Sequence, residues 1–259
     1  MSRLTTILAL SFFLFGLVLS LDDFLDCPGN DGFFHFFRRC CTSDDLPNGC
    51  ECFDTSYLSP FTNSGFQLPS CPNRIDASFK LFNPSSKSGS IIKADKDCVS
   101  DSEFDPSLPT RVVTHGFTES GSTSWMLEMK DEFLKLEACN VILVDWKRGA
   151  RAPNYNQAVA NTRVVGAMIA RLVDDLNICK NADFQDFHLI GHSLGAHVMG
   201  YAGEEIERLR EVKLGRISGL DPAGPKFDGY STVVKVDESD ASFVDIIHTD
   251  AEDWLSPGQ

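Results

Sequence analysis

Short apolar runs without polar alternation begin after residue 110 and constrain the fold more than any other feature of this sequence. They occupy residues 112–113, 141–144, 187–190 and 243–247, and residues 216–220 form a weaker example. Such runs are typical of strands that are buried on both faces of a parallel sheet. Helical patterns lie between them, at residues 155–179 and 194–210. This alternation predicts βαβ units, and hence an α/β fold with a mostly parallel central sheet.

The N-terminus has a different character. Arg3 is followed by a mostly apolar stretch from residue 4 to residue 21, with small residues near its end. This pattern is typical of a secretory signal peptide that is cleaved near Ser20. A membrane anchor is the alternative, but the run is short and no basic stop-transfer cluster follows it. We therefore assign residues 1–20 to a signal peptide and expect a secreted protein without a transmembrane segment.

The charge balance argues against two classes of partner. The chain has 23 basic and 37 acidic residues, which gives a formal net charge of −14. A field of this sign does not attract nucleic acid or an anionic lipid surface. We therefore expect no nucleic-acid partner, and we expect any lipid contact to be apolar.

All nine cysteines follow the signal segment, which indicates disulfides in an exported chain. Seven of them lie in a stretch rich in Pro, Ser, Asn and Gly. We therefore expect residues 21–105 to be a loop-rich, disulfide-stapled segment and residues 106–259 to be the catalytic core. Because nine is odd, at least one cysteine has a partner beyond residue 259 or is a free thiol. Zinc is disfavoured, since the spacings lack paired C-x2-C units.

Residues 191–195 read Gly-His-Ser-Leu-Gly, a G-x-S-x-G motif between the apolar run 187–190 and a helical pattern that begins at Leu194. A nucleophile elbow needs this strand–turn–helix setting, which exposes the serine hydroxyl at the end of the strand. The positive end of the following helix favours negative charge on a reacting oxygen. A turn serine between two glycines is the plainer alternative, but it leaves the flanking strand and helix unexplained. The motif predicts Ser193 as a nucleophile.

An oxyanion hole in such a fold uses two backbone N–H groups. One belongs to the residue after the nucleophile, here Leu194. The other comes from a loop after an earlier strand, and Phe117 follows the run at 112–113 in this way. His115 precedes Ser193, and we interpret it as structural because the fold places its catalytic histidine after the serine.

Asp221 follows the run at 216–220 in a turn rich in Pro and Gly. A carboxylate at the end of a later strand can orient an imidazole and stabilise its cationic form. An aspartate that merely starts a turn before Pro222 is the local alternative, but the Ser-then-Asp order favours catalysis. His248 is the one histidine beyond Asp221, so order alone names it as the base.

Five motifs together resemble the pancreatic lipase family: residues 114–117, 144–147, 191–196, 219–225 and 243–250. The resemblance runs from about residue 111 to residue 250. It implies an α/β-hydrolase fold, with Ser193 as nucleophile, Asp221 as triad acid, and Phe117 and Leu194 as oxyanion donors. It implies no cofactor for catalysis, and it does not determine whether a colipase-like partner binds.

The resemblance disagrees with the assignment of His248 as the base from the order of residues in the sequence. In this family the stretch that resembles residues 247–250 does not supply the base, which lies downstream of a cysteine-bounded lid and before a C-terminal β-sandwich domain. The run at 243–247 also lacks a following crossover helix. We therefore expect this chain to be a fragment without its catalytic histidine and to be inactive.

The resemblance also implies a structural calcium just after the triad acid. Its ligands would be the carboxylates of Asp237 and Asp240 and the backbone carbonyls of Thr232 and Lys235, which are suitable hard oxygen donors. Thr232 departs from the family, where an acidic residue is often found, but only its carbonyl would be used. A solvated acidic loop is the alternative interpretation.

The expected function is that of a secreted serine carboxylic-ester hydrolase acting on lipid esters at an interface, of the triacylglycerol lipase or phospholipase A1 type. A non-catalytic lipid-binding or storage protein on a lipase fold is the alternative, which the intact Ser193 disfavours for the parent protein. A peptidase or thioesterase of the same fold ranks third, because the motifs around Asp221 argue against it.

Overall fold

The computed structural model describes residues 38–56, 59–94 and 102–249. The proposed signal peptide, residues 1–20, lies outside the described residues. Within them, none of the helices combines the length and apolar character needed to cross a bilayer.

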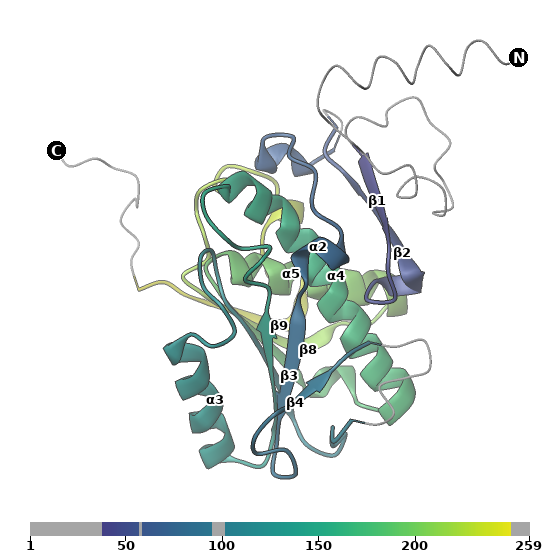
Figure 1. Ribbon diagram of the computed structural model, residues 1–259, viewed down its shortest axis with the longest axis vertical. Coiled ribbons are helices and arrows are strands. Elements are labelled where there is room, and N and C mark those ends of the chain that lie inside the picture. Colours follow the sequence, from purple (N-terminus) through teal and green to yellow (C-terminus); the bar gives the residue numbers. More distant parts are fainter. Residues whose placement is uncertain (1–37, 57–58, 95–101, 250–259) are drawn as a thin grey trace, which may run out of the picture.

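A seven-stranded sheet forms the centre of the molecule, with the strand order β4-β3-β6-β5-β7-β8-β9 (Figure 1). Strands β5 to β9 run parallel, whereas β3 is antiparallel to both of its neighbours. Each predicted apolar run lies in one of the parallel strands, which confirms the mostly parallel α/β sheet. The strands are β3 (Ser78–Phe82), β4 (Ser90–Ile92), β5 (Thr110–Thr114), β6 (Asn140–Asp145), β7 (Phe187–His192), β8 (Leu214–Leu220) and β9 (Ala241–Ile247).

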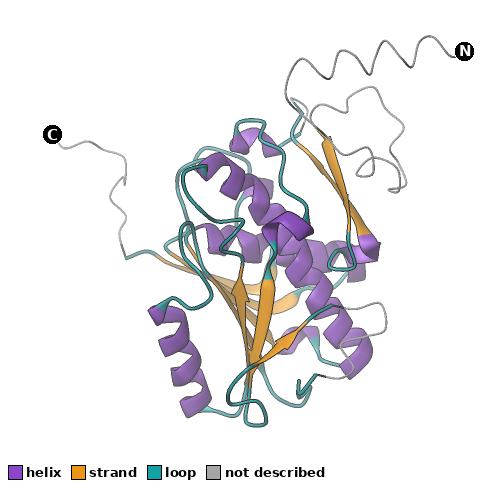
Figure 2. Cartoon of the chain, in the orientation of Figure 1, coloured by secondary structure: helices purple, strands orange, loops and turns teal. Residues whose placement is uncertain are grey.

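Helices cover both faces of the sheet (Figure 2). Because side chains alternate along a strand, Val112 and Val113 of β5 point to opposite faces. Val112 belongs to the core beneath the long helices α4 (Tyr155–Lys180) and α5 (Leu194–Arg210), whereas Val113 belongs to the core beneath α3 (Ser124–Leu136). The remaining helical turns are α2 (Pro72–Ile75), η3 (Pro47–Gly49), η4 (Phe61–Ser64), η5 (Phe184–Asp186) and η6 (Thr232–Val234).

The cysteine-rich segment contains an antiparallel hairpin of β1 (Arg38–Thr42) and β2 (Cys50–Asp54). A disulfide joins Cys40 to Cys52 across this hairpin, and a second joins Cys41 to Cys71. Cys50 and Cys179 are also disulfide-bonded. The expected disulfides are therefore present.

Cys139 is a free thiol, buried between α3 and β6. Burial raises the pKa of this thiol, so it remains protonated and packs as a small apolar side chain. Among the described residues, Cys139 thus has no disulfide partner.

Two features differ from the sequence-based expectation. Residues 78–92, within the segment expected to be rich in loops, supply β3 and β4 to the main sheet. Strand β9 was expected to be buried on both faces, but Phe243 is 57% exposed and Ile247 is 50% exposed. The reason is position, because β9 is the edge strand beyond β8 and no further strand pairs with it among the described residues.

Candidate active site

The strand order marks one point at the carboxyl edge of the sheet where a ligand site is expected. Strand β5 has β6 on one side and β7 on the other. The order in which successive strands join the sheet therefore reverses at β5. In open α/β sheets, ligands bind outside the carboxyl ends of the strands at such a point. Thr114 pairs with Gly191, and Gly191 pairs with Gly219. The loops after β5, β7 and β8 therefore begin side by side.

Ser193 stands in the sharp turn between β7 and α5. Its φ of 55° and ψ of −120° are strained for a residue with a side chain. Neighbouring backbone fixes this turn, because the Ser193 N–H donates to the Leu220 carbonyl at 3.0 Å. The flanking glycines are required by space, since a Cβ on Gly191 would lie 2.1 Å from the carbonyl oxygen of Gly195. The geometry is that of a nucleophile elbow.

The loop after β5 packs directly against this turn. A Cβ on Gly116 would lie 2.7 Å from the Cβ of Ser193. The loop is held by a hydrogen bond from the Thr118 N–H to the Ala150 carbonyl, at 2.7 Å, and by the edge-on contact between the rings of Phe117 and Tyr155. Among the described residues, the N–H groups of Phe117 and Leu194 have no acceptor. Two N–H donors beside Ser193 are thus left available.

Glu119 joins the same loop to the elbow, and the sequence analysis did not identify it. Its carboxylate accepts hydrogen bonds from the Gly116 N–H at 2.8 Å, from Trp125 Nε1 at 2.9 Å and from His192 Nδ1 at 2.9 Å. Burial by itself would raise the pKa of Glu119, but these bonds outweigh it and lower the pKa to about 2. The hydrogen bond with Glu119 raises the pKa of His192, which favours the charged imidazole beside the carboxylate.

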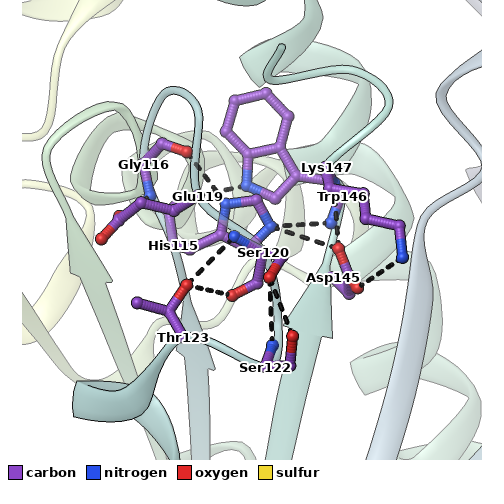
Figure 3. A network of polar contacts seen from close by, with 9 residues as sticks. All are labelled: His115, Gly116, Glu119, Ser120, Ser122, Thr123, Asp145, Trp146 and Lys147. Atoms are coloured by element: carbon purple, nitrogen blue, oxygen red, sulfur yellow. Dashed lines mark hydrogen bonds and ion pairs between the residues drawn. The ribbon is translucent and has the colours of Figure 1, made fainter.

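His115 is fully buried and lies beneath this loop in a polar network (Figure 3). Its Nδ1 donates to the Gly116 carbonyl, and its Nε2 accepts from the Trp146 N–H at 3.0 Å. These two contacts require the neutral Nδ1–H tautomer. The indole of Trp146 stacks on the imidazole and donates to the His115 carbonyl. His115 therefore supports the loop from below and does not reach Ser193.

Asp221 follows β8 at the same edge. Its N–H donates to the Ile247 carbonyl at 2.8 Å, and the Ala223 N–H donates to the Ser193 carbonyl at 3.3 Å, so the turn after β8 contacts the elbow. The two oxygens of the Asp221 carboxylate accept hydrogen bonds from the N–H and the hydroxyl of Thr249. Thr249, rather than His248, is thus the bonded neighbour of Asp221 at the end of β9.

No histidine of the described residues forms a hydrogen bond with the Ser193 hydroxyl. His188 bonds to Ser218, and His197 bonds to the Ala223 carbonyl and the Val236 N–H. His248 is exposed, and no hydrogen bond joins it to Asp221 in the described part of the chain. The structure therefore brings together the serine, the acid and the two N–H donors, without a bonded imidazole.

The predicted calcium ligands lie in and after η6. Asp240 is 1% exposed, and its Oδ2 accepts from the Asp237 N–H at 2.9 Å, whereas its Oδ1 has no hydrogen-bond partner. Burial raises the pKa of Asp240 to about 7, despite the bond from Asp237. Burial and the charges of Asp240 and Asp237 likewise raise the pKa of Glu204 to about 8. Within the described residues, no cluster of three His, Cys, Asp or Glu side chains has a metal-binding arrangement.

Comparison with known proteins agrees with this geometry. A family model described as "Lipase" matches residues 51–258. Pancreatic lipase-related protein 2 of Cavia porcellus is 45% identical over 185 residues, which are 71% of this chain and 42% of that protein. Pancreatic triacylglycerol lipase of Myocastor coypus is 44% identical over 203 residues, which are 78% of this chain and 43% of that protein.

Inactive pancreatic lipase-related protein 1 of Mus musculus is 42% identical over 187 residues, 71% of this chain and 38% of that protein. The chain thus spans less than half the length of these relatives. Among solved structures, acetyl xylan esterase from Aspergillus awamori is similar with a TM-score of 0.36 and 14% identity, over 63% of this chain and 53% of that chain. At that TM-score the likeness adds no argument.

The parallel sheet and the strained serine turn at its carboxyl edge define an α/β-hydrolase. Within that class, the chain belongs to the lipase family, and specifically to its pancreatic lipase group.

Proposed function

We propose that this chain is the nucleophile-bearing part of a secreted serine carboxylic-ester hydrolase that acts on lipid esters, of the triacylglycerol lipase or phospholipase A1 type. The observation that supports it best is the geometry around Ser193. The serine occupies a strained turn, with the N–H groups of Phe117 and Leu194 beside it and without acceptors among the described residues. Unpaired N–H groups near a nucleophile suit a developing oxyanion.

The chemistry follows from these positions. Ser193 Oγ attacks the ester carbonyl while an imidazole removes its proton and later returns it to the leaving alcohol. The N–H groups of Phe117 and Leu194 donate to the tetrahedral oxyanion. Asp221 orients the imidazole and stabilises its charged form. Each carboxylate oxygen has two lone pairs, so Asp221 can accept an imidazole N–H and retain its bonds from Thr249.

In this proposal His248 is not the base, and none of the described histidines bonds to the Ser193 hydroxyl. Support comes from the contacts of the two residues, because the Asp221 carboxylate bonds to Thr249 whereas the exposed His248 forms no hydrogen bond with it among the described residues. The 259-residue polypeptide should therefore show no ester turnover above buffer.

Secretion and a lipid substrate are part of the same proposal. The disulfides Cys40–Cys52 and Cys41–Cys71 are consistent with an oxidising compartment. The lipase family assignment supports a lipid ester as the substrate class. The choice between triacylglycerol and phospholipid, and the binding of a colipase-like partner, both stay open.

We also propose that the segment after η6 holds a structural calcium ion. The buried, unpaired Oδ1 of Asp240 is the fitting observation, because a buried carboxylate oxygen without a donor suits a cation. The Asp237 carboxylate and the carbonyls of Thr232 and Lys235 would complete the set of hard oxygen ligands. The ion would fix the segment between β8 and β9 and take no part in ester cleavage.

A non-catalytic lipid-binding protein is the second candidate function. It is favoured by the lack of an imidazole bonded to Ser193 or Asp221 among the described residues. A relative named as inactive also occurs at 42% identity. The preserved turn and N–H donors at Ser193 favour the hydrolase.

Hydrolysis of p-nitrophenyl butyrate with and without added imidazole tests the proposal. Without imidazole, the intact chain should match buffer. With imidazole, it should release p-nitrophenol faster than Ser193→Ala at the same imidazole concentration, because the small base can accept the Ser193 proton that no described histidine is bonded to accept. Equal rates would argue for the lipid-binding alternative. Turnover without imidazole that His248→Ala abolishes in a folded chain would show that the assignment of the base is wrong.

A further inference from the structure

A polar cavity lies away from the serine turn, between α2 and the loop that joins β6 to α4. Its volume is about 470 Å³. Helix α2 lies against α4 at this place (Figure 1). The walls include three arginines, Arg74 from α2 and Arg148 and Arg151 from the loop. No aspartate or glutamate lines the cavity.

The charges of these arginines are largely uncompensated. Arg148 pairs with Asp76 at 2.8 Å, and both side chains are more than half exposed. Within the described residues, neither Arg74 nor Arg151 forms an ion pair. A concentration of three guanidinium groups contrasts with the net charge of −14 for the chain. The local field at the cavity therefore opposes the overall field and selects for an anion.

The side-chain amides of Asn161 and Gln157, which line the cavity, already form hydrogen bonds within the protein. Asn161 is 2% exposed, and its Nδ2 donates to the Gly149 carbonyl at 2.9 Å. Its Oδ1 accepts from the Ser70 N–H and from Gln157 Nε2, which also donates to the Leu68 carbonyl. The guanidinium groups of Arg74 and Arg151, which form no ion pair among the described residues, are thus the charged donors available to a ligand.

The chemistry of these donors identifies the ligand class. A planar guanidinium presents paired N–H groups that match phosphate oxygens in a bidentate manner. Helix α4 begins at Tyr155, and its N-cap Asn154 lines the cavity, so the positive end of a 26-residue helix adds to the attraction. We propose that this cavity, with Arg74, Arg148 and Arg151, binds a phosphate group, either of a small soluble phosphomonoester or of a phospholipid headgroup.

The site is distinct from Ser193 but shares a structural element with it. Ala150, in the loop between Arg148 and Arg151, accepts the hydrogen bond from Thr118 that holds the loop after β5. The segment of residues 148–151 therefore borders the proposed phosphate site and, through Ala150, also holds the loop after β5 beside Ser193. Phosphate binding does not depend on ester hydrolysis, so failure of either proposal leaves the other standing.

Titration calorimetry of the intact chain with inorganic phosphate tests the site. We expect saturable binding of one phosphate per chain, which the double change Arg74→Gln/Arg151→Gln weakens at least about tenfold, because it removes two charged hydrogen-bond donors. The matched control is Lys87→Gln/Lys93→Gln, which removes the same charge from two exposed lysines outside the cavity. Arg151→Lys, which keeps the charge but loses the planar fork, should give intermediate affinity.

Vesicle flotation distinguishes the two sources of phosphate. Binding to phosphatidylcholine vesicles that contain phosphatidic acid, lost in the double arginine variant and competed by inorganic phosphate, would identify a headgroup. Binding of inorganic phosphate without binding to vesicles would identify a soluble ligand. The proposal is overturned if folded chains show no saturable binding in calorimetry or in vesicle flotation. It is also overturned if the lysine control variant weakens phosphate binding as much as the double arginine variant.

Discussion

The carboxylate of Glu119 accepts a hydrogen bond from Nδ1 of His192 at 2.9 Å and so ties the loop after β5 to the turn that carries Ser193. A second bond, from the Gly116 N–H to the same carboxylate, fixes the loop where it packs on the serine. Neither residue is expected to react with substrate. Their pairing fixes the loop that carries the N–H of Phe117 relative to the turn of Ser193.

The Glu119–His192 pair should make stability depend on pH. The pKa of Glu119 is lowered to about 2, so its contribution is present above its ordinary value of 4.5 and is lost as the pH falls from there towards 2. The pKa of His192 is raised, so its contribution is full below 6.5 and is lost as the pH rises through the raised value. We therefore expect Glu119→Gln to be most destabilising between pH 4.5 and 6.5, by about 1 kcal/mol for this partly exposed pair.

Urea unfolding at pH 5.5 and at pH 9 measures this difference. Glu128→Gln, at an exposed glutamate of α3, is the matched control and should change the free energy of unfolding little at either pH. An equal loss for Glu119→Gln at the two pH values would mean that the ion pair adds nothing to the neutral hydrogen bonds.

Gly191→Ala should be far more disruptive than an ordinary glycine replacement. The new Cβ would lie 2.1 Å from the backbone oxygen of Gly195, which cannot move without opening the turn. We expect a loss of about 3 kcal/mol or more in the free energy of unfolding. Gly229→Ala is the control, because its φ of +76° is unfavourable for alanine but nothing lies within 4 Å, and it should cost only about 1 kcal/mol. Similar losses in thermal or urea unfolding would contradict the packing argument.

Arg163 should anchor the disulfide-stapled hairpin to α4. Its guanidinium lies 3.6 Å from the ring centroid of Phe61, and it donates to the Asp54 carbonyl at 3.0 Å. Arg163→Lys keeps the charge but loses the planar stacking, and should cost about 1–2 kcal/mol. Arg111→Lys, where the guanidinium is 5.8 Å from the ring of Phe133, should cost less. Comparable effects in urea unfolding would remove the special role assigned to Arg163.

Calcium should raise the melting temperature of the chain, and a chelator should reverse the effect. In the metal-free chain the pKa of Asp240 is raised to about 7, so the folded state binds more protons and loses stability as the pH rises from about 4 to 7. Asp240→Asn removes the buried charge. It should abolish the calcium response and flatten this part of the pH profile.

Asp186→Asn, at an exposed aspartate of η5, serves as the control and should leave the calcium response intact. Differential scanning calorimetry with and without calcium makes the comparison. A calcium-induced shift that persists in Asp240→Asn would place the ion elsewhere.

Much of the fold was predictable because long local patterns determine it. The start of α5 at Leu194 follows from the change from strand to helix pattern around Ser193, and the parallel strands follow from apolar runs. Strand β3 was missed because residues 78–82 lie in a stretch whose Pro, Ser and Cys content indicates loops, whereas pairing with β6 holds it in the sheet. The exposure of β9 depends on its place at the edge, which periodicity does not report.

The geometry of the site was predictable where a motif sets the backbone, as at the strained turn of Ser193. Glu119 carries no such motif, and its role depends on the distance between two loops that only the folded chain brings together. The bond between Thr249 and Asp221 likewise depends on the register of β8 and β9. The arginine cavity combines residues 74 and 151, which are far apart in the sequence.

The central claim is that Ser193 is a nucleophile held ready beside two N–H donors. Reaction of the intact chain with a fluorophosphonate in the presence of imidazole, followed by peptide mapping by mass spectrometry, tests it most directly. The account predicts one phosphonylated residue, Ser193, modified faster as imidazole is added and more slowly in Asp221→Asn. Failure to modify Ser193 in the folded chain, or modification of other serines at the same rate, would contradict it.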